Sequence, residues 1–375
     1  MEHSLKIVIG ANYGDEGKGL MSRYFTKEFG RAVTVFHNGS AQRGHTADYE
    51  DGTRHVFHNF GAGTKDGGAT YYADTFLVHP MDFCREVREL GFVPEVSCSP
   101  QCLVVTPLDM LADHIIEDHI AAVKGQREYG SCGYGTWSAT DRAKERPDLA
   151  FTLYDMMTKD FQGISDALKE WVVQRLKTFR VNLDLVPSWK HFFEPNDQAY
   201  LNMWTNFAYD LWYFLRNVKL ASFDDIWREN KAIIFEGAQG LLLDKDRDGI
   251  WNTTSNTGLK NPHMLLSGKT DFHAEVCYVS RSYVTRHGEG PLDNEVEKKE
   301  LGEELFDQTN VFNQFQGDLR YAKLPNGEMF REIVKDFSIV NSDRYEPSIA
   351  FTHCNEHDID GGDYRSYSPH EVIRV

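Results

Sequence analysis

Residues 5–19 read LKIVIGANYGDEGKG, and this stretch decides the fold. Its first six residues are a β-branched apolar run that ends in glycine, which predicts a buried strand. Residues 20–29 then carry apolar side chains at helical spacing. A strand, a glycine loop and a helix in this order open a parallel-sheet α/β unit.

The glycine loop, residues 10–19, has the composition of an anion-binding turn. Its glycines allow the backbone to approach an anion at a helix N-terminus. Lys18 supplies a charge for phosphate, and Asp15 and Glu16 supply carboxylates for a metal or a proton. The loop is not a Walker A motif, because its first glycine lies two residues too far from the Gly17-Lys18 pair and glycine replaces the following Ser or Thr.

The rest of the chain predicts one large α/β domain, residues 1–375, with a mostly parallel central sheet flanked by helices. Further strands are expected at residues 32–37, 231–235 and 274–284, and helices at residues 110–124, 161–185 and 200–218. The last of these helices is strongly aromatic, and we expect it to be buried. Because the sequence contains no internal repeat or linker, the helices around residues 105–230 are expected to be excursions from the single domain.

The composition disfavours several classes of protein. A formal charge of −17 over 375 residues repels nucleic-acid backbones and anionic lipid, so neither is expected as a partner. The six cysteines have no disulfide or zinc-site spacing, and no apolar run reaches the about 18–20 residues that cross a bilayer. The first residues also lack the pattern of a targeting segment. We therefore expect a soluble, cytoplasmic protein that binds small molecules.

Three more polar loops are expected at strand ends. Residues 42–46, QRGHT, place His45 between glycine and threonine, which suits a general acid or a phosphate donor. Residues 235–244, FEGAQGLLLD, offer glycines and an amide, and residues 253–257, TTSNT, offer hydroxyl groups to phosphate. Loops at the carboxyl ends of parallel strands meet at one edge, so together they predict a single ligand crevice.

In combination, these motifs resemble the adenylosuccinate synthetase family. The matching segments are GDEGKG at 14–19, GHT at 44–46, FEGAQG at 235–240, TRHGEGP at 285–291 and SYSP at 366–369. They occur in that family's order and at comparable spacing, so the resemblance covers nearly the whole chain. It implies a fold related to the P-loop nucleoside triphosphatases. It also implies a ligase that phosphorylates the 6-oxygen of a 6-oxopurine nucleoside monophosphate and then replaces that phosphate with the amine of L-aspartate.

The resemblance implies roles for individual residues. Asp15 is expected to remove the purine N1 proton and, with the carbonyl of Gly44, to bind Mg²⁺. His45 is expected to be the acid in phosphoryl transfer, and Gln239 to orient the 6-oxo group. The expected triphosphate-binding residues are Gly14, Glu16, Gly17, Lys18, Gly19, Gly44, Thr46, Arg320, Asn355 and Ser368. The expected residues for the nucleoside monophosphate are Asp15, Lys18, Gln42, Ser131, Cys132, Arg146, Gln239, Thr253 and Thr254.

Two segments depart from the family pattern. The arginine-rich aspartate loop is QGDLRY at 316–321, so Gln316, Gly317 and Arg320 are expected to hold aspartate. One of the missing arginines reaches the ribose hydroxyls in the family, which indicates a 2′-deoxynucleotide. The Lys-x-Asp signature that reads guanine in GTP is HCN at 353–355. Because asparagine can pair with adenine, GTP or ATP is expected as the co-substrate.

These departures resemble a bacteriophage branch of the family, which uses dGMP to make N6-succino-2-amino-dAMP for 2-aminoadenine DNA. Phage members often replace the catalytic aspartate with a small residue, whereas Asp15 is intact here. We therefore expect IMP or dIMP as the substrate, with dGMP as the alternative and an inactive nucleotide-binding relative as a second alternative. Arg146 matches an arginine that a neighbouring subunit contributes in the family, so a homodimer is expected.

Three charged segments have simpler interpretations. Residues 244–249, DKDRDG, imitate the start of a calcium-binding loop, but the twelfth position is Ser255 rather than glutamate, so an Asp-rich turn is expected. The acidic run at residues 295–304 predicts an exposed helix face, and residues 357–363 a solvated turn. A regulatory GTPase is disfavoured by the spacing of the glycine loop.

Overall fold

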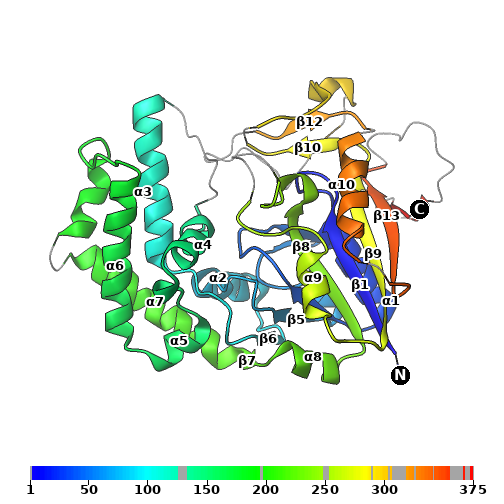
Figure 1. Cartoon of the computed structure of the whole chain (residues 1–375), viewed down its shortest axis with the longest axis horizontal. Helices are drawn as coiled ribbons and strands as arrows, with labels where there is room; N and C mark the ends of the chain where they lie inside the picture. The colour runs from blue at the N-terminus through cyan, green and yellow to red at the C-terminus, as the bar shows by residue number, and fades with distance from the viewer. Residues whose placement is uncertain are drawn as a thin grey trace.

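The computed structural model contains a ten-stranded sheet (Figure 1). It describes residues 2–125, 133–194, 197–247, 253–288, 290–302, 305, 318–324, 327–340 and 342–354, and the backbone of 366–367 and 372–374. In sheet order the strands are β14 (Ser366–Tyr367), β15 (Val372–Arg374), β13 (Tyr345–Thr352), β9 (Phe272–Arg281), β1 (His3–Gly10), β8 (Ala232–Gly240), β2 (Val33–Phe36), β5 (Ala69–Tyr72), β6 (Val96–Cys98) and β7 (Lys219–Leu220). The strands from β13 to β7 are parallel, which confirms the predicted fold class.

β1 lies at the centre of the sheet, between β8 and β9. Its register pairs Ile7 with Phe235 of β8 and with Val276 of β9. Because the three strands are parallel, their carboxyl ends reach the same edge of the sheet. Strands are present at all four predicted places, but β8 continues to Gly240 and β9 ends at Arg281.

Successive residues of β1 alternate between two apolar cores, as the pleat of a strand requires. Val8 packs in a cluster with Met21 and Phe25 of α1 (Lys18–Phe29), which covers one face of the sheet. Ile7 belongs to a cluster on the other face with Met329 of α10 (Gly327–Phe337), close to α9 (Lys260–Leu265). The helices on both faces explain why most residues of the central strands are apolar.

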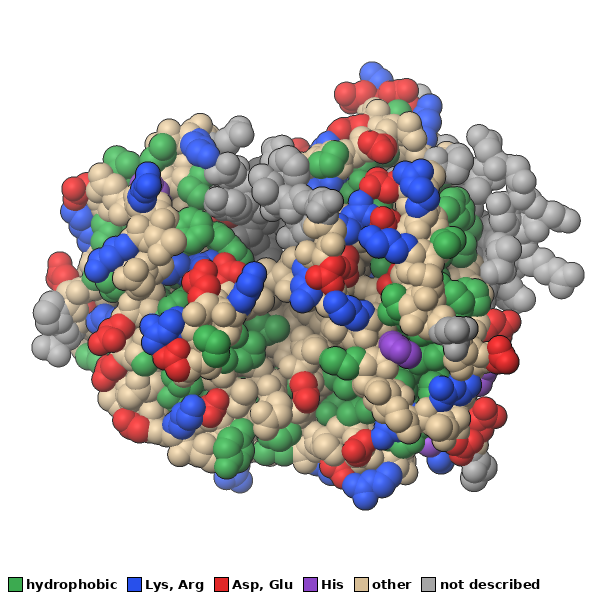
Figure 2. Space-filling view, in the orientation of Figure 1, with side chains coloured by type: hydrophobic (Ala, Val, Ile, Leu, Met, Phe, Trp, Pro, Cys, Tyr) green, Lys and Arg blue, Asp and Glu red, His purple; other side chains and the backbone are tan. Residues whose placement is uncertain are grey.

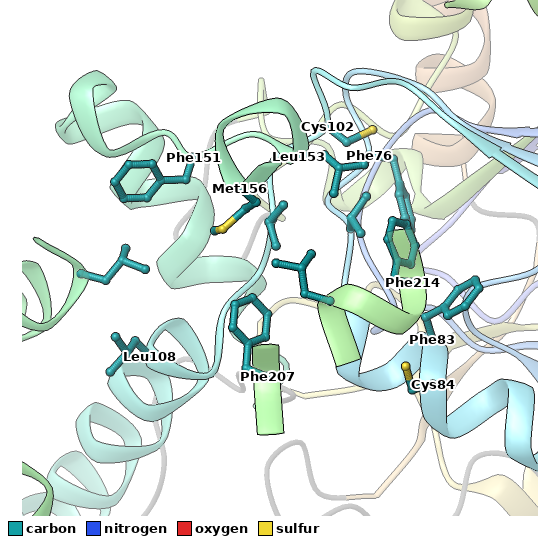
Figure 3. Close-up of a cluster of buried hydrophobic side chains, with 14 of the residues drawn as sticks. Phe76, Phe83, Cys84, Cys102, Leu108, Phe151, Leu153, Met156, Phe207 and Phe214 are labelled. Carbon is teal, nitrogen blue, oxygen red and sulfur yellow. The ribbon is translucent and has the colours of Figure 1, made fainter. Parts of the chain in front are cut away.

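A helical lobe lies between β6 and β7 in the sequence (Figure 1, left). It contains α3 (Pro107–Lys124), α4 (Thr136–Glu145), α5 (Leu153–Thr158), α6 (Phe161–Thr178) and α7 (Gln198–Asn217), while α2 (Pro80–Leu90) and α8 (Phe223–Glu229) flank it in sequence. One apolar cluster runs from Phe76 and Phe83 to Phe207 and Phe214 of α7 (Figure 3). The lobe and the sheet therefore share a core.

Three sequence predictions differ from the structure. α6 ends at Thr178 rather than at residue 185, because Arg180 adopts a left-handed φ of 51° that a helix cannot continue through. α7 is amphipathic rather than buried, with Trp212 57% exposed. The described part of the acidic run forms a short strand and a 3-10 turn instead of a helix.

Two small sheets complete the fold. One contains β10 (Val284–Arg286), β12 (Arg320–Ala322) and β11 (Glu295–Val296), and Figure 1 shows it above the carboxyl ends of β1 and β8. The other is a hairpin of β3 (His45–Asp48) and β4 (Arg54–Phe57). Within the described ranges, no helix has both the length and the apolar composition that a membrane span requires. On the face drawn in Figure 2, acidic and basic side chains are interspersed.

Candidate functional site

The glycine loop after β1 is organised around the carboxylate of Glu16, which is 1% exposed. Its Oε1 atom accepts hydrogen bonds from the backbone N–H groups of Asn12 (3.0 Å) and Gly14 (2.8 Å). Its Oε2 atom lies 2.6 Å from Nζ of Lys18. Glu16, which the resemblance places at the triphosphate, thus holds the loop together and orients Lys18 in this structure.

Two glycines make room for that carboxylate. A Cβ atom on Gly10 would lie 2.4 Å from Oε2 of Glu16, and one on Gly240 would lie 2.6 Å from Oε1. Neither distance is possible for real atoms, so the end of β1 and the end of β8 both require glycine. The glycines at both strand ends therefore have a packing cause, because the Glu16 side chain touches both ends.

Replacing Glu16 with alanine is expected to lower the free energy of unfolding by roughly 3–5 kcal/mol, because Lys18 would keep a buried charge without its partner. Denaturant unfolding followed by circular dichroism measures this. The control is Glu28→Ala, since Glu28 is 39% exposed in its ion pair with Lys6 and its loss should cost no more than about 1 kcal/mol. Equal losses for both variants would contradict the structural role of Glu16.

Asp15 has a strained backbone and a partly open carboxylate. Its φ of 61° is left-handed, and its carbonyl accepts a hydrogen bond from Nε of Arg281 at 2.5 Å. Oδ2 of Asp15 lies 3.5 Å from Nε2 of His287, and the side chains are 30% and 18% exposed. Gln239 is also left-handed, with a φ of 66°. Left-handed residues other than glycine are costly and gather at functional sites, so both positions are candidates for chemistry.

Gln239, near the end of β8, lies beside Gly14 in the loop that follows β1. A Cβ atom on Gly14 would lie 3.8 Å from both Cα and Oε1 of Gln239. The side-chain amide of Gln239 is therefore beside the residue that precedes Asp15. The backbone of Ala238, the residue before Gln239, is fixed by the side chain of Asn38. This side chain accepts a hydrogen bond from the N–H of Ala238 (2.8 Å) and donates one to the carbonyl of Ala238 (2.9 Å).

His45 forms a buried pair with Glu236. Nδ1 of His45 lies 2.6 Å from Oε1 of Glu236, and Nη1 of Arg43 lies 3.6 Å from the same oxygen. Burial alone would raise the pKa of Glu236, but His45 and Arg43 outweigh this effect and hold the pKa below its ordinary value. The ionised carboxylate accepts a hydrogen bond from Nδ1–H of His45, which leaves Nε2 outside this pair.

The pair has a defined protonation preference. Burial lowers the pKa of His45, although the Glu236 carboxylate opposes this effect. Burial also lowers the pKa of Arg43 to about 10, and its guanidinium stacks on the ring of Phe36 at 3.8 Å. A lowered pKa favours the neutral imidazole, and the Glu236 carboxylate beside it would stabilise a positive charge on the ring.

Residues expected to bind phosphate converge on α4. Oγ1 of Thr136, at the start of this helix, donates a hydrogen bond to Oε1 of Gln42 at 3.1 Å. Oγ1 of Thr140, one turn later, lies 3.5 Å from Oγ1 of Thr254. Thr253 is adjacent, where its N–H donates to the carbonyl of Leu243 at 2.8 Å. The structure thereby brings Gln42, Thr253 and Thr254 to one place.

The Asp-rich turn at residues 244–247 forms hydrogen bonds with the segment that follows Thr254. The Asp244 carboxylate accepts hydrogen bonds from the N–H of Thr257 at 2.6 Å and from Nδ2 of Asn256 at 3.2 Å. These bonds hold the segment around Thr254 against the end of β8. Among the described residues there is no group of three or more His, Cys, Asp or Glu side chains suited to a metal. Residues 245–246 form a turn, as the sequence predicted.

A sequence model of the adenylosuccinate synthetase family matches residues 7–320. The chain belongs to this family. It is 28% identical to an adenylosuccinate synthetase of Clostridium botulinum (strain Alaska E43 / Type E3) over 77% of this chain. It is 25% identical to the enzyme of Picrophilus torridus over 79% of this chain. The matches cover 65% and 66% of those relatives, so the chain spans just under two thirds of their length.

Solved structures of two members share the fold. The fully ligated adenylosuccinate synthetase of Plasmodium falciparum gives a TM-score of 0.63 at 19% identity, covering 85% of this chain and 71% of that one. The succinoaminodeoxyadenylate synthetase of cyanophage S-2L, bound to dGMP and to dATP as an energy donor, gives 0.59 at 16% identity. That match covers 90% of this chain and 82% of the phage chain. The predicted family and its fold are thus confirmed.

Some residues expected at the site have other partners or positions. Arg320 forms a bidentate ion pair with Glu295 (2.8 and 2.5 Å) and donates to the carbonyls of Gly288 and Gly290. Arg146 is exposed and pairs with Asp148. Gly17, which has a φ of 91°, precedes the first residue of α1, and Gly19 is the second residue of that helix. Gly44 and Thr46 are the chain neighbours of His45. Ser131, Cys132, Gln316, Gly317, Asn355 and Ser368 lie outside the described residues.

Sequence reasoning missed several residues that build the site. Glu236 was visible within the motif FEGAQG, but its pairing with His45 was not. Arg281 and Thr352 both hold the glycine loop, the second by donating to the carbonyl of Glu16 at 2.7 Å. Nothing in the sequence marked Thr136 as a site residue, because a threonine after glycine is common at the start of a helix. A carboxylate directly after the apolar run KAIIF was the one cue to Glu236.

Proposed function

We propose that this chain is a ligase that joins L-aspartate to C6 of a 6-oxopurine nucleoside monophosphate, driven by hydrolysis of GTP or ATP. The observation that carries the proposal is the placement of Asp15, Gln239 and the His45–Glu236 pair at the carboxyl ends of neighbouring strands. These groups match what a 6-oxopurine needs: a base for N1, an amide for O6 and an acid for the phosphoryl group.

The reaction has two steps. Asp15 takes the N1 proton, so O6 becomes nucleophilic and attacks the γ-phosphorus while the bond to the β–γ bridging oxygen breaks. His45 and Lys18 stabilise the charge on the phosphoryl oxygens, and the nucleoside diphosphate leaves. The aspartate amine then attacks C6, loses a proton, and expels the 6-phosphate as inorganic phosphate. Gln239 holds the 6-oxygen in place through the first step.

We also propose that Asp15 and the carbonyl of Gly44 hold Mg²⁺. The Asp15 carboxylate is 30% exposed, and Mg²⁺ is usually bound by one or two carboxylates together with substrate phosphates. These residues therefore fit the ion once a triphosphate supplies the remaining oxygens. When bound, Mg²⁺ neutralises charge on the triphosphate.

The second candidate is the phage-type reaction, which uses dGMP and ATP to give N6-succino-2-amino-dAMP. It is favoured by the aspartate loop, where Arg320 is paired with Glu295 and the sequence offers no other arginine between residues 316 and 321. A site with fewer cations at the ribose suits a 2′-deoxynucleotide. We place either reaction in the cytoplasm, where free nucleotides are available, and propose a homodimer in which the exposed Arg146 reaches the partner's site.

The test is aspartate-dependent phosphate release. Purified protein with Mg²⁺, L-aspartate and ATP or GTP is incubated separately with IMP, dIMP and dGMP, and the product is identified by mass spectrometry. A succinylated nucleotide formed with stoichiometric phosphate from one of these substrates is the expected result. Phosphate release that is absent, or that does not depend on aspartate, with all three purines would identify an inactive relative or a simple triphosphatase.

A further inference from the structure

Three acidic side chains lie along one face of α10. Glu328, Glu332 and Asp336 follow one another at intervals of four residues, so they form a stripe on the helix surface. This stripe contacts the chain before and after Thr253 and Thr254, the residues expected at the phosphate of the nucleoside monophosphate (Figure 1). α10 therefore spans the segment that carries these two threonines.

The first attachment is an ion-pair network that precedes the threonines in the sequence. Nη2 of Arg247 lies 2.5 Å from Oε1 of Glu328, and its Nη1 lies 2.8 Å from Oε1 of Glu332. The three side chains are only 18 to 25% exposed. One guanidinium group thus connects the Asp-rich turn to two successive turns of α10 and offsets the charge of both glutamates.

The second attachment is made by Asp336 and follows the threonines. Oδ1 and Oδ2 of Asp336 lie 2.9 and 3.1 Å from the backbone nitrogen of Leu259, and Oδ2 also accepts a hydrogen bond from the hydroxyl of Tyr278 at 2.8 Å. Leu259 is completely buried, so its N–H needs an acceptor inside the protein. The carboxylate therefore joins this part of the chain to both α10 and β9.

Gly258 shows how closely the carboxylate fits against the chain. A Cβ atom on Gly258 would lie 2.1 Å from Oδ1 of Asp336, a distance that real atoms do not allow. One residue earlier, Oγ1 of Thr257 donates a hydrogen bond to the carbonyl of Gly240 at 3.0 Å. The chain that follows Thr254 is thus held between the end of β8 and α10.

We propose, on the basis of the ligase function above, that Asp336 is a positioning residue for the nucleoside monophosphate. Its carboxylate holds the segment of Thr253 and Thr254 where their hydroxyl groups meet the phosphate, and Asp336 itself does not touch the substrate. A displacement of about 1 Å is enough to spoil contacts that orient a substrate, so loss of the bond to Leu259 should weaken binding of the phosphate. A carboxylate that only stabilised the fold would not change the preference for a phosphorylated ligand.

The test compares each nucleotide with its nucleoside. Dissociation constants for IMP and inosine, and for dGMP and deoxyguanosine, are measured by calorimetry on the wild type, Asp336→Ala, Asp336→Asn and Gly258→Ala. Asparagine keeps an oxygen for the N–H of Leu259, whereas the substitution at Gly258 displaces the carboxylate without removing it. The control is Asp160→Ala, since Asp160 accepts two backbone N–H groups at the start of α6 in the helical lobe. Unfolding curves check that each variant is folded.

We expect Asp336→Ala and Gly258→Ala to weaken binding of both nucleotides by roughly 10- to 100-fold and to change binding of the nucleosides by less than about three-fold. Asp336→Asn and the control should stay within about three-fold of the wild type for all four ligands. Because both damaging changes act on the same contact, the double variant Asp336→Ala with Gly258→Ala should bind within about three-fold of the weaker single variant.

Several results would overturn the role of Asp336. These are a wild type without preference for the nucleotides, unchanged nucleotide binding in Asp336→Ala, equal losses for nucleotides and nucleosides, and additive losses in the double variant. If Asp336→Ala does not fold, Gly258→Ala gives the same comparison, because it displaces the same carboxylate. If the expected binding pattern is found without aspartate-dependent phosphate release, the ligase proposal fails while the role of Asp336 stands. Aspartate-dependent release with unchanged affinities in the variants has the opposite meaning.

Discussion

Replacing Asp15 with asparagine is expected to lower kcat of the ligase reaction by roughly 10³-fold, because an amide cannot accept the N1 proton and general bases of this kind contribute about 10²- to 10⁴-fold. The variant should remain folded. Asparagine tolerates the left-handed φ of 61° about as well as aspartate does, so the strained backbone is retained. Steady-state phosphate release with saturating purine nucleotide, triphosphate and L-aspartate measures the effect.

The control for this variant is Asp166→Asn. Asp166 accepts a hydrogen bond from Gln162 on the exposed side of α6, away from the strand ends, so its replacement should leave kcat within about two-fold. Denaturant unfolding of both variants separates a chemical effect from a loss of folded protein. If Asp15→Asn keeps more than a tenth of the wild-type kcat, residue 15 is not the base.

The second large effect is expected for the His45–Glu236 pair. His45→Asn and Glu236→Gln should each lower kcat by roughly 10²- to 10³-fold, and the double variant should cost little more than the worse single variant. The reason is that the carboxylate acts only through the imidazole: it holds Nδ1 at 2.6 Å and stabilises the positive charge that appears when His45 is protonated. A double-variant cycle with kcat as the readout measures this coupling.

A matched control exists elsewhere in the chain. His55 pairs with the buried Glu86 at 3.3 Å, so His55→Asn removes a comparable pair outside the strand ends. This variant should lower stability but leave kcat nearly unchanged. Additive losses for His45→Asn and Glu236→Gln would mean that the two side chains act independently, and the proposed acid would have to be assigned to another group.

The sequence was sufficient to predict the sheet because its strands are parallel and buried. Runs such as LKIVIG and KAIIF are apolar on both faces, and each is followed by glycine-containing polar residues. The same reasoning predicted that the loops would meet, since carboxyl ends of parallel strands share an edge. Residues 236–240 were assigned to a loop, however, although they continue β8. A buried glutamate in a strand is stable only with a partner, and His45 is 191 residues away in the sequence.

Charge pairing was the part of the site that the sequence could not predict. Glu16 and Lys18 are two residues apart, but their contact depends on the space above Gly10 and Gly240, which only the folded sheet defines. Arg320 was expected at the nucleotide and pairs with Glu295 instead, since β11 and β12 are neighbours in the small sheet. Long side chains reach partners through tertiary contacts, and local sequence patterns carry no record of those contacts.

The central position of β1 also has a consequence for biogenesis. Its two partners follow it by about 230 and 270 residues in the chain, as the pairs Ser4 with Ala232 and His3 with Phe272 show. At roughly 5–20 residues per second, a ribosome would leave β1 without either neighbour for about 10–50 seconds. During synthesis, the apolar strand β1 therefore has no strand partner until most of the chain has left the ribosome. Such long-range pairing makes folding slow and makes the nascent protein a natural client of chaperones.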